Sequence, residues 1–465
     1  MAAASVISMV LAAVRTKLFA LWLGPSGVGL LGTLSAIADV TRSLASLGLP
    51  NSAVRQIAQA QARGDLPGLH LSVYVLRISM WSLGLMACLV LWMSAEAVSQ
   101  WTFGHLTFAS GVAWLGLAVC LRMVADGQGA LLQGLRRIPD LARESIVGST
   151  LSLVVAVACV YVWGMQGIAF SLVAVAAVSA AVAWLYVRRI QLPDAPRQTH
   201  ELTQEISRQL RLGLSFMLSS LVVLGAGYVV RWLLIGELGL EQAGLYQAAS
   251  ALGTLFVSLV LQSMSADFFP RLVASGDDSD HGSRIVNEQV LVGLLLAGTG
   301  TAWTLTLAPV LISVFYSPQF VVAAETMRWV CLGMAVKVVT WPVATWLIAR
   351  ESQVLFLLLD VVWATTLIGL AMWGVQALGL PGVGMAVAAA YLVQAAIMLP
   401  VAQRIGALRW TPGVLKTGAL MGVTLMGCFA ATQWLSDPWS ELAGAGIAIS
   451  LLIYSAIRLR RLVPM

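Results

Sequence analysis

Apolar segments of about 20 residues, each long enough to cross the hydrocarbon core of a membrane, recur along the whole chain. Short polar connections separate them, and this pattern predicts about fourteen transmembrane helices. The sequence therefore predicts an all-α, polytopic membrane protein. The expected spans are residues 2–23, 27–49, 70–94, 106–130, 145–165, 167–187, 212–235, 243–266, 289–315, 322–348, 353–375, 381–402, 414–434 and 441–457.

The connections between these spans alternate in charge. One set is short and contains no Lys or Arg, as in Gly24–Ser26 and Gly236–Gln242. The other set is basic and contains, among others, Arg136, Arg188 and Arg458. Basic connections stay on the cytoplasmic side of a membrane, so both termini are expected in the cytoplasm.

Composition supports the same class of protein. The chain is 59% hydrophobic and only 10% charged, whereas soluble domains carry about 25% charged residues. The net charge of +6 is explained by the basic connections on the cytoplasmic side and does not indicate a nucleic-acid partner. The five cysteines all fall within apolar segments, and no two of them form a CxxC motif. This pattern favours a role in packing for the cysteine side chains.

The usual signatures of cofactors and enzymes are missing. The four histidines are scattered and predict no metal site. No lysine follows a glycine-rich phosphate-binding loop, so the chain is not expected to hydrolyse ATP. We predict a protein that is not an enzyme and has no cofactor.

A polar segment divides the chain near its middle. Residues 188–211 contain Pro193 and Pro196 and predict a cytoplasmic linker. It separates an N-terminal lobe at 1–187 from a C-terminal lobe at 212–404. Residues 405–465 add two helices and a basic tail.

The two lobes match weakly but in order, which suggests an internal repeat. Arg15 corresponds to Arg231, and Gly29 corresponds to Gly244. The triplet at residues 143–145 corresponds to the triplet at 350–352. An even number of spans per lobe gives a parallel repeat around a central cavity, with a binding site between the lobes. Arg15 and Arg231 are expected to face that cavity.

Charges within the spans are the candidate site, because each costs about 2.5–3.5 kcal/mol to insert. Cations outnumber acids there, which favours an anionic ligand. The candidate acids for ion coupling are Asp39 and Asp360. The candidate substrate-binding cations, which include Arg55 at the cytoplasmic surface, are Arg15, Lys17, Arg42, Arg55, Arg77, Arg231 and Lys337.

Some of these charges have a simpler structural explanation. Asp39 and Arg42 are three residues apart and can neutralise each other on one helical face. Arg122 and Asp126 are four residues apart, and we predict a local ion pair. Arg77 can extend towards the membrane surface, and Lys337 can do so or pair with Asp360. Arg15, Lys17 and Arg231 have no acid at these spacings, which favours a functional role.

The segment LGPSGVGLLG at Leu23–Gly32, preceded by VRTKLFALW and followed by SLGLPNSAVRQIAQ, resembles the opening of Wzx-type O-antigen flippases. These flippases belong to the multidrug/oligosaccharidyl-lipid/polysaccharide (MOP) exporter superfamily. The resemblance implies two lobes of helices around a cavity, in a bacterial inner membrane. It also implies an undecaprenyl-diphosphate-linked oligosaccharide as cargo, flipped to the outer leaflet by alternating access.

The expected partners are this glycan, the lipid bilayer, a polysaccharide polymerase and a chain-length regulator. Arginine suits the diphosphate, because its planar guanidinium binds phosphate oxygens in a bidentate fashion. Two alternatives in the same superfamily remain, a lipid II flippase and a drug/cation antiporter. A membrane polysaccharide polymerase is disfavoured by the small outer connections.

Overall fold

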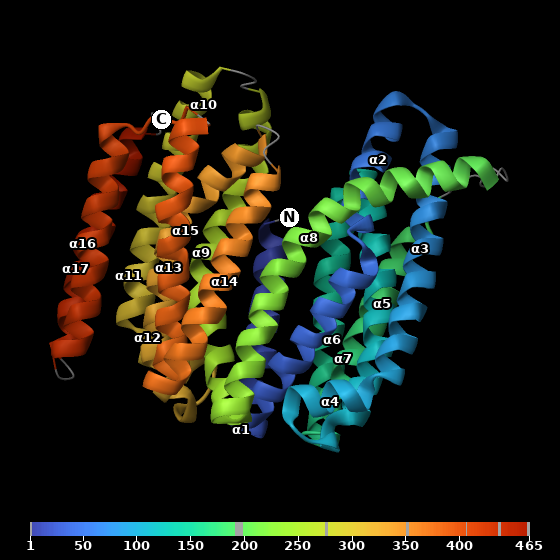
Figure 1. Ribbon diagram of the computed structural model, residues 1–465, viewed down its shortest axis with the longest axis horizontal. Coiled ribbons are helices and arrows are strands. Elements are labelled where there is room, and N and C mark those ends of the chain that lie inside the picture. Colours follow the sequence, from blue (N-terminus) through green and yellow to red (C-terminus); the bar gives the residue numbers. More distant parts are fainter. Residues whose placement is uncertain are drawn as a thin grey trace. The chain divides into compact units, whose positions relative to one another are not determined.

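The structure is a computed structural model that describes residues 2–190, 199–274, 278–349, 353–405, 407–435 and 439–462 (Figure 1). Its regular elements are all helical, which confirms the predicted fold class for this part of the chain. Two compact units follow one another along the sequence, Met1–Gly244 and Leu245–Met465. Residues 191–198 of the predicted linker and 350–352 of the predicted repeat lie outside the described residues.

The helices of the first unit are α1 (Ala2–Ser46), α2 (Leu49–Arg63), α3 (Leu66–Met93), α4 (Ala95–Phe103), α5 (Ala109–Gly134), α6 (Ile138–Trp163), α7 (Gly167–Val187) and α8 (Thr199–Leu238). Next comes α9 (Leu240–Ala274), whose first residues belong to this unit. The second unit continues with α10 (Ser279–Gly293), α11 (Thr299–Thr306), α12 (Ala308–Phe315), α13 (Ala324–Ala349), α14 (Gln353–Leu378), α15 (Leu380–Ile405), α16 (Pro412–Trp434) and α17 (Trp439–Leu462).

Thirteen helical stretches in the described residues are long and apolar enough to cross a membrane, whereas the sequence predicted about fourteen. The difference lies in α1, which contains both of the first two expected spans. A straight helix as long as its apolar stretch of 43 residues would measure about 65 Å, twice a hydrocarbon core of about 30 Å. Gly24, with φ 64° and ψ −168°, breaks the helix before Pro25. The two expected spans are the parts of α1 on either side of this break.

A short helix, α4, occupies what the sequence predicted only as a connection. Its buried residues Ala95, Ser99, Thr102 and Phe103 share one helical face. Hydrogen bonds attach it to α8: Trp232 Nε1 donates to the Trp101 carbonyl oxygen, and Tyr228 Oη lies 2.7 Å from Thr102 Oγ1. Because α4 and α2 lie at opposite ends of the first unit, these bonds hold α8 at the α4 end (Figure 1).

A buried polar network holds α8 at the other end of the unit. Glu205 is 6% exposed and accepts hydrogen bonds from Ser72 Oγ at 2.7 Å and Gln209 Nε2 at 3.0 Å. Arg208 forms an ion pair with Glu205 at 2.7 Å and donates to Gln56 Oε1 of α2. Since Ser72 belongs to α3, this network joins α8 to both α2 and α3.

Two glycines allow the start of α9 to approach α1 closely. A Cβ added at Gly29 would lie 2.9 Å from the Gly244 nitrogen, and one added at Gly244 would lie 2.8 Å from the Gly29 nitrogen. Real Cβ atoms essentially never come this close to another heavy atom. These two glycines are the pair that the sequence repeat matched to each other, so the structure brings two predicted equivalents into contact.

In the second unit, Asn287 attaches the segment before α16 to α10. Its amide nitrogen donates to the carbonyl oxygens of Ser283 and Arg409 at 2.7 Å. Its Oδ1 accepts a hydrogen bond from the Thr411 backbone nitrogen at 2.8 Å. One buried side chain thereby provides hydrogen-bond partners for backbone groups on both segments.

Candidate functional site

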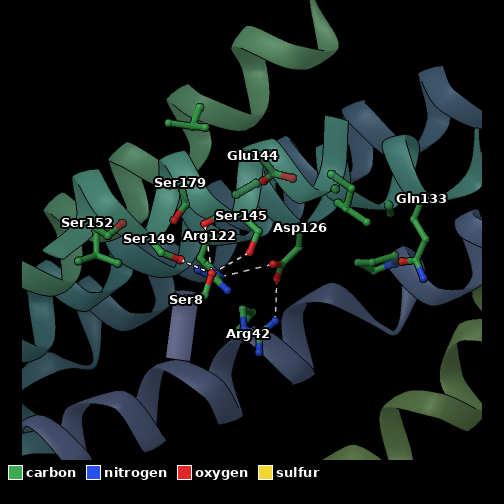
Figure 2. A pocket seen from close by; sticks show the side chains of 18 of the residues that line it. Ser8, Arg42, Arg122, Asp126, Gln133, Glu144, Ser145, Ser149, Ser152 and Ser179 are labelled. Atoms are coloured by element: carbon green, nitrogen blue, oxygen red, sulfur yellow. Dashed lines mark hydrogen bonds and ion pairs between the residues drawn. The ribbon is translucent and has the colours of Figure 1, made fainter. Parts of the chain in front are cut away.

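A cavity of about 760 Å³ lies within the first unit. It is lined by residues from α1, α5, α6, α7 and α8 and from the start of α2, and Figure 2 shows ten of its side chains labelled. The volume falls in the range of about 300–1,000 Å³ that encloses small ligands. Its charged lining residues are Arg15, Arg42, Arg122, Asp126 and Glu144. Its serines are Ser8, Ser43, Ser46, Ser145, Ser149, Ser152, Ser179 and Ser220.

One face of α6 supplies much of the polar lining. Glu144, Ser145, Gly148, Ser149 and Ser152 follow one another at spacings of one, three and four residues and therefore share a helical face. All five line the cavity. The exposed residues of α6 include the apolar Val147, Leu151 and Val154. In a membrane, such a helix would present its apolar face to lipid and its polar face to the cavity.

Serine hydroxyls also connect α6 to the first part of α1. Ser8 Oγ lies 3.0 Å from Ser145 Oγ and accepts a hydrogen bond from Ser149 Oγ at 2.9 Å (Figure 2). Hydroxyl groups can both donate and accept, so this cluster can rearrange its hydrogen bonds when a polar ligand approaches.

A chain of three ion pairs runs from α1 to α5, and one of the three joins the two helices. Asp126 contacts Arg42 at 2.6 Å and Arg122 at 3.4 Å (Figure 2). Arg42 also contacts Asp39 at 3.3 Å. The predicted local pairs Asp39–Arg42 and Arg122–Asp126 are therefore confirmed. The pair between Arg42 and Asp126 joins two helices that are distant in sequence. With Asp39 and Asp126 against Arg42 and Arg122, this cluster is formally neutral. The cavity lining has three arginines against two acids, because Arg15 adds a cation and Glu144 replaces Asp39 in that set.

The structure brings only some of the predicted cations to this cavity. Arg15 and Arg42 line it, and Asp39 contacts Arg42. Arg15 has no hydrogen bond or ion pair with any residue that the structure describes. The cavity lining does not include Lys17, Arg55, Arg77, Arg231, Lys337 or Asp360.

The remaining candidates have other surroundings. Arg231 donates a hydrogen bond to the Gly227 carbonyl oxygen at 2.8 Å, one turn earlier in α8. Arg55 is exposed on α2, and Arg77 is exposed on α3 beside Ile78, which is 49% exposed. The Lys337 ammonium lies 5.6 Å from the centre of the Tyr391 ring. Asp360 is buried in α14.

Sequence reasoning did not place Glu144 and the serines at a cavity, and it treated Arg122 only as an ion-pair partner. A signal was present in α6, where polar residues and glycine repeat at helical spacing through an otherwise apolar span. The search for charged residues in the middle of spans overlooked this signal, because serine costs little to insert and Glu144 lies close to the end of its span.

Asp126→Asn should mainly reduce stability, because it removes an ion-pair partner from both Arg42 and Arg122. The loss should be about 1–3 kcal/mol, since two partly buried ion pairs are broken while Arg42 keeps Asp39 and Arg122 is half exposed. The measurement is the thermal unfolding midpoint of purified protein in detergent, with Asp140→Asn as the control at the end of α6. A variant of normal stability that fails to transport would instead assign Asp126 a direct role in transport.

A family model described as "Polysaccharide biosynthesis protein" matches residues 1–275. The lipid III flippases of Escherichia coli strain K12 and Shigella flexneri are each 24% identical to the chain over 394 residues. Those alignments cover 81% of this chain and 90% of each flippase.

Solved structures share the fold of this chain. An inward-facing multidrug resistance transporter of the MATE family and MOP superfamily superposes with a TM-score of 0.74 and 17% identity, covering 86% of this chain and 95% of that one. The lipid II flippase MurJ in an inward closed conformation gives a TM-score of 0.69 and 13% identity, covering 98% of both chains. The chain therefore has a MATE- and MurJ-like fold. These relatives are flippases and transporters, in agreement with the prediction that the chain is not an enzyme.

Proposed function

Because the chain belongs to the polysaccharide biosynthesis protein family, we propose that it is a flippase for a lipid-linked oligosaccharide. The proposed cargo is an undecaprenyl-diphosphate-linked repeat unit of O-antigen or another surface polysaccharide. It moves from the cytoplasmic to the outer leaflet of a bacterial inner membrane, in which both termini of the flippase face the cytoplasm. The observation that carries the proposal is the cavity, which places arginines and serine hydroxyls together inside a bundle of apolar helices.

The residues suit both polar parts of this cargo. Arg15 and Arg42, with Arg122 beside them, provide charged donors for the diphosphate oxygens. The serines of α6 provide donors and acceptors for sugar hydroxyls. The polyprenyl tail is apolar and stays in the lipid, so only the headgroup has to enter the cavity.

The predicted two-lobe organisation and the other cations form part of the proposal. Lobes at 1–187 and 212–404, joined by the linker at 188–211, would alternate access to the site. Arg55, exposed on α2, would attract the diphosphate before it enters. The other candidates keep their predicted roles without a test. These are the substrate-binding cations Lys17, Arg77, Arg231 and Lys337 and the coupling acids Asp39 and Asp360.

The proposal is tested by reconstituting the purified protein in liposomes that contain a fluorescent undecaprenyl-diphosphate-linked oligosaccharide. Translocation is measured as the fraction of label that becomes accessible to a membrane-impermeant glycosidase. We expect a rate well above that of protein-free vesicles and of vesicles containing Arg15→Glu. Equal rates in all three preparations would contradict the flippase function. Export of a cationic dye in the same vesicles would favour the drug antiporter instead.

A further inference from the structure

Two glycines in the cavity wall are not used for helix packing. A Cβ added at Gly129 of α5 or at Gly148 of α6 would have no heavy atom within 4 Å. Both residues line the cavity, so the added atom would lie in open space. Other glycines on α5 differ: a Cβ at Gly116 would lie 2.7 Å from the Cys88 carbonyl oxygen, and one at Gly134 would lie 2.7 Å from Ile57.

Glycine within a helix carries an energetic cost, so each one needs a compensating reason. Relative to alanine it destabilises a helix by roughly 0.5–1 kcal/mol. At Gly116 and Gly134 close packing accounts for the residue, because a side chain would collide with a neighbouring helix. At Gly129 and Gly148 no neighbour requires it, and the remaining effect of glycine is to enlarge the cavity.

The position of Gly148 relates that space to the serines. It lies on the polar face of α6, next to Ser149, three residues after Ser145 and four residues before Ser152. Serine hydroxyls rotate and serve as either donor or acceptor, so this wall can satisfy sugars whose hydroxyl groups differ in configuration. Hydrogen bonding of this kind discriminates weakly between sugars. Selection among sugars therefore depends on the shape of the wall.

The volume of the cavity limits which part of the cargo it can enclose. A site of about 760 Å³ encloses a ligand of drug size, comparable to a diphosphate with the sugars nearest to it. A longer repeat unit would extend beyond the cavity. With the proposed cargo bound, the wall would therefore contact the sugars beside the diphosphate, whatever the length of the glycan.

We propose that Gly148, together with Gly129, limits the size of the sugar that the cavity accepts next to the diphosphate. This role rests on the proposed flippase function. The site tolerates different hydroxyl patterns and excludes substituents that would overlap the α6 backbone at Gly148. Filling this space should narrow the range of cargo without preventing transport.

The test uses the series Gly148→Ala, Gly148→Leu and Gly148→Phe in the full-length protein. Each variant is reconstituted with two probes. The first is undecaprenyl diphosphate carrying a single labelled N-acetylhexosamine, and the second carries a labelled oligosaccharide branched at its first sugar. Gly422, exposed on α16 with no atom within 4 Å of its added Cβ, provides the matched control series.

We expect Gly148→Phe to slow the branched probe by about tenfold or more while the single-sugar probe stays within about twofold of wild type. Gly148→Ala should leave both rates nearly unchanged, and Gly422→Phe should affect neither. If Gly148→Phe does not reach the membrane at the wild-type level, Gly148→Leu and Gly129→Leu serve for the same comparison. Each variant also needs an unfolding midpoint close to that of wild type.

Three results would overturn the proposal, and they can be told apart. Equal slowing of both probes would mean that the new side chain obstructs the site without selecting by size. Unchanged rates for both probes would remove Gly148 from the path of the cargo. A wild-type protein that moves neither probe would refute the flippase function itself.

Discussion

Arg15→Glu should abolish transport, Arg15→Gln should remove most of it, and Arg15→Lys should keep a part. Arg15 lines the cavity and has no ion-pair partner among the described residues, so its removal leaves no carboxylate without a partner. A lost charge-assisted contact to phosphate is worth about 1.5–3 kcal/mol, or roughly a ten- to hundredfold loss of binding. The measurement is restoration of surface polysaccharide in a flippase-deficient strain, with membrane levels determined by immunoblot.

Arg77 provides the matched comparison for Arg15. It is also an arginine within an apolar helix, but its side chain is exposed on α3 beside Ile78. Arg77→Gln should therefore reduce transport much less than Arg15→Gln, at equal membrane levels. If the two variants were equally impaired, or if Arg15→Gln were fully active, the cavity would lose its assigned role in binding the diphosphate.

Gly244→Leu should prevent the protein from folding, and Gly29→Leu should have a similar effect. Each new side chain would collide with the backbone of the other segment, which cannot move aside as a flexible side chain could. We expect a destabilisation of at least about 3 kcal/mol, at the upper end of what overpacking produces. The measurements are the yield of monodisperse protein in detergent and its unfolding midpoint.

Gly236→Leu is the control for this pair. Gly236 lies near the end of α8, is exposed, and has no atom within 4 Å of an added Cβ. It should give normal yield and stability. A well-folded Gly244→Leu protein would show that the approach of α9 to α1 is looser than the structure describes.

The sequence predicted the helices well because each span carries its own signal. An apolar run of about 20 residues needs no tertiary information to be recognised. The ion pairs Asp39–Arg42 and Arg122–Asp126 were also predictable, since their partners share one helix. The break at Gly24 was not recognised as lying within one nearly continuous helix, because a glycine before a proline also suits an ordinary loop.

The cavity could be predicted only in part, because its residues come from helices whose neighbours the local pattern does not specify. Nothing in the spacing indicates that Arg42 contacts Asp126, 84 residues away. The insertion cost of a charge identified Arg15 and Arg42 but did not separate them from Arg77, whose long side chain can extend along the surface of its helix. The polar face of α6 was readable from its spacing.

The hydrogen bonds at the two ends of α8 restrict how this helix can deform. Glu205 and Gln209 fix one end to Ser72 of α3, while Tyr228 and Trp232 fix the other end to α4. Swinging one end away would break the hydrogen bonds that the buried Glu205 and Gln209 form with the buried Ser72, and swinging the other away would break that of the buried Thr102. The cost is about 1–3 kcal/mol for each buried group that loses its partner. With both ends attached, α8 can bend only in its middle. The part of α8 that lines the cavity, from Met217 to Leu224, lies in that middle, so the cavity can change its width there while both attachments remain intact.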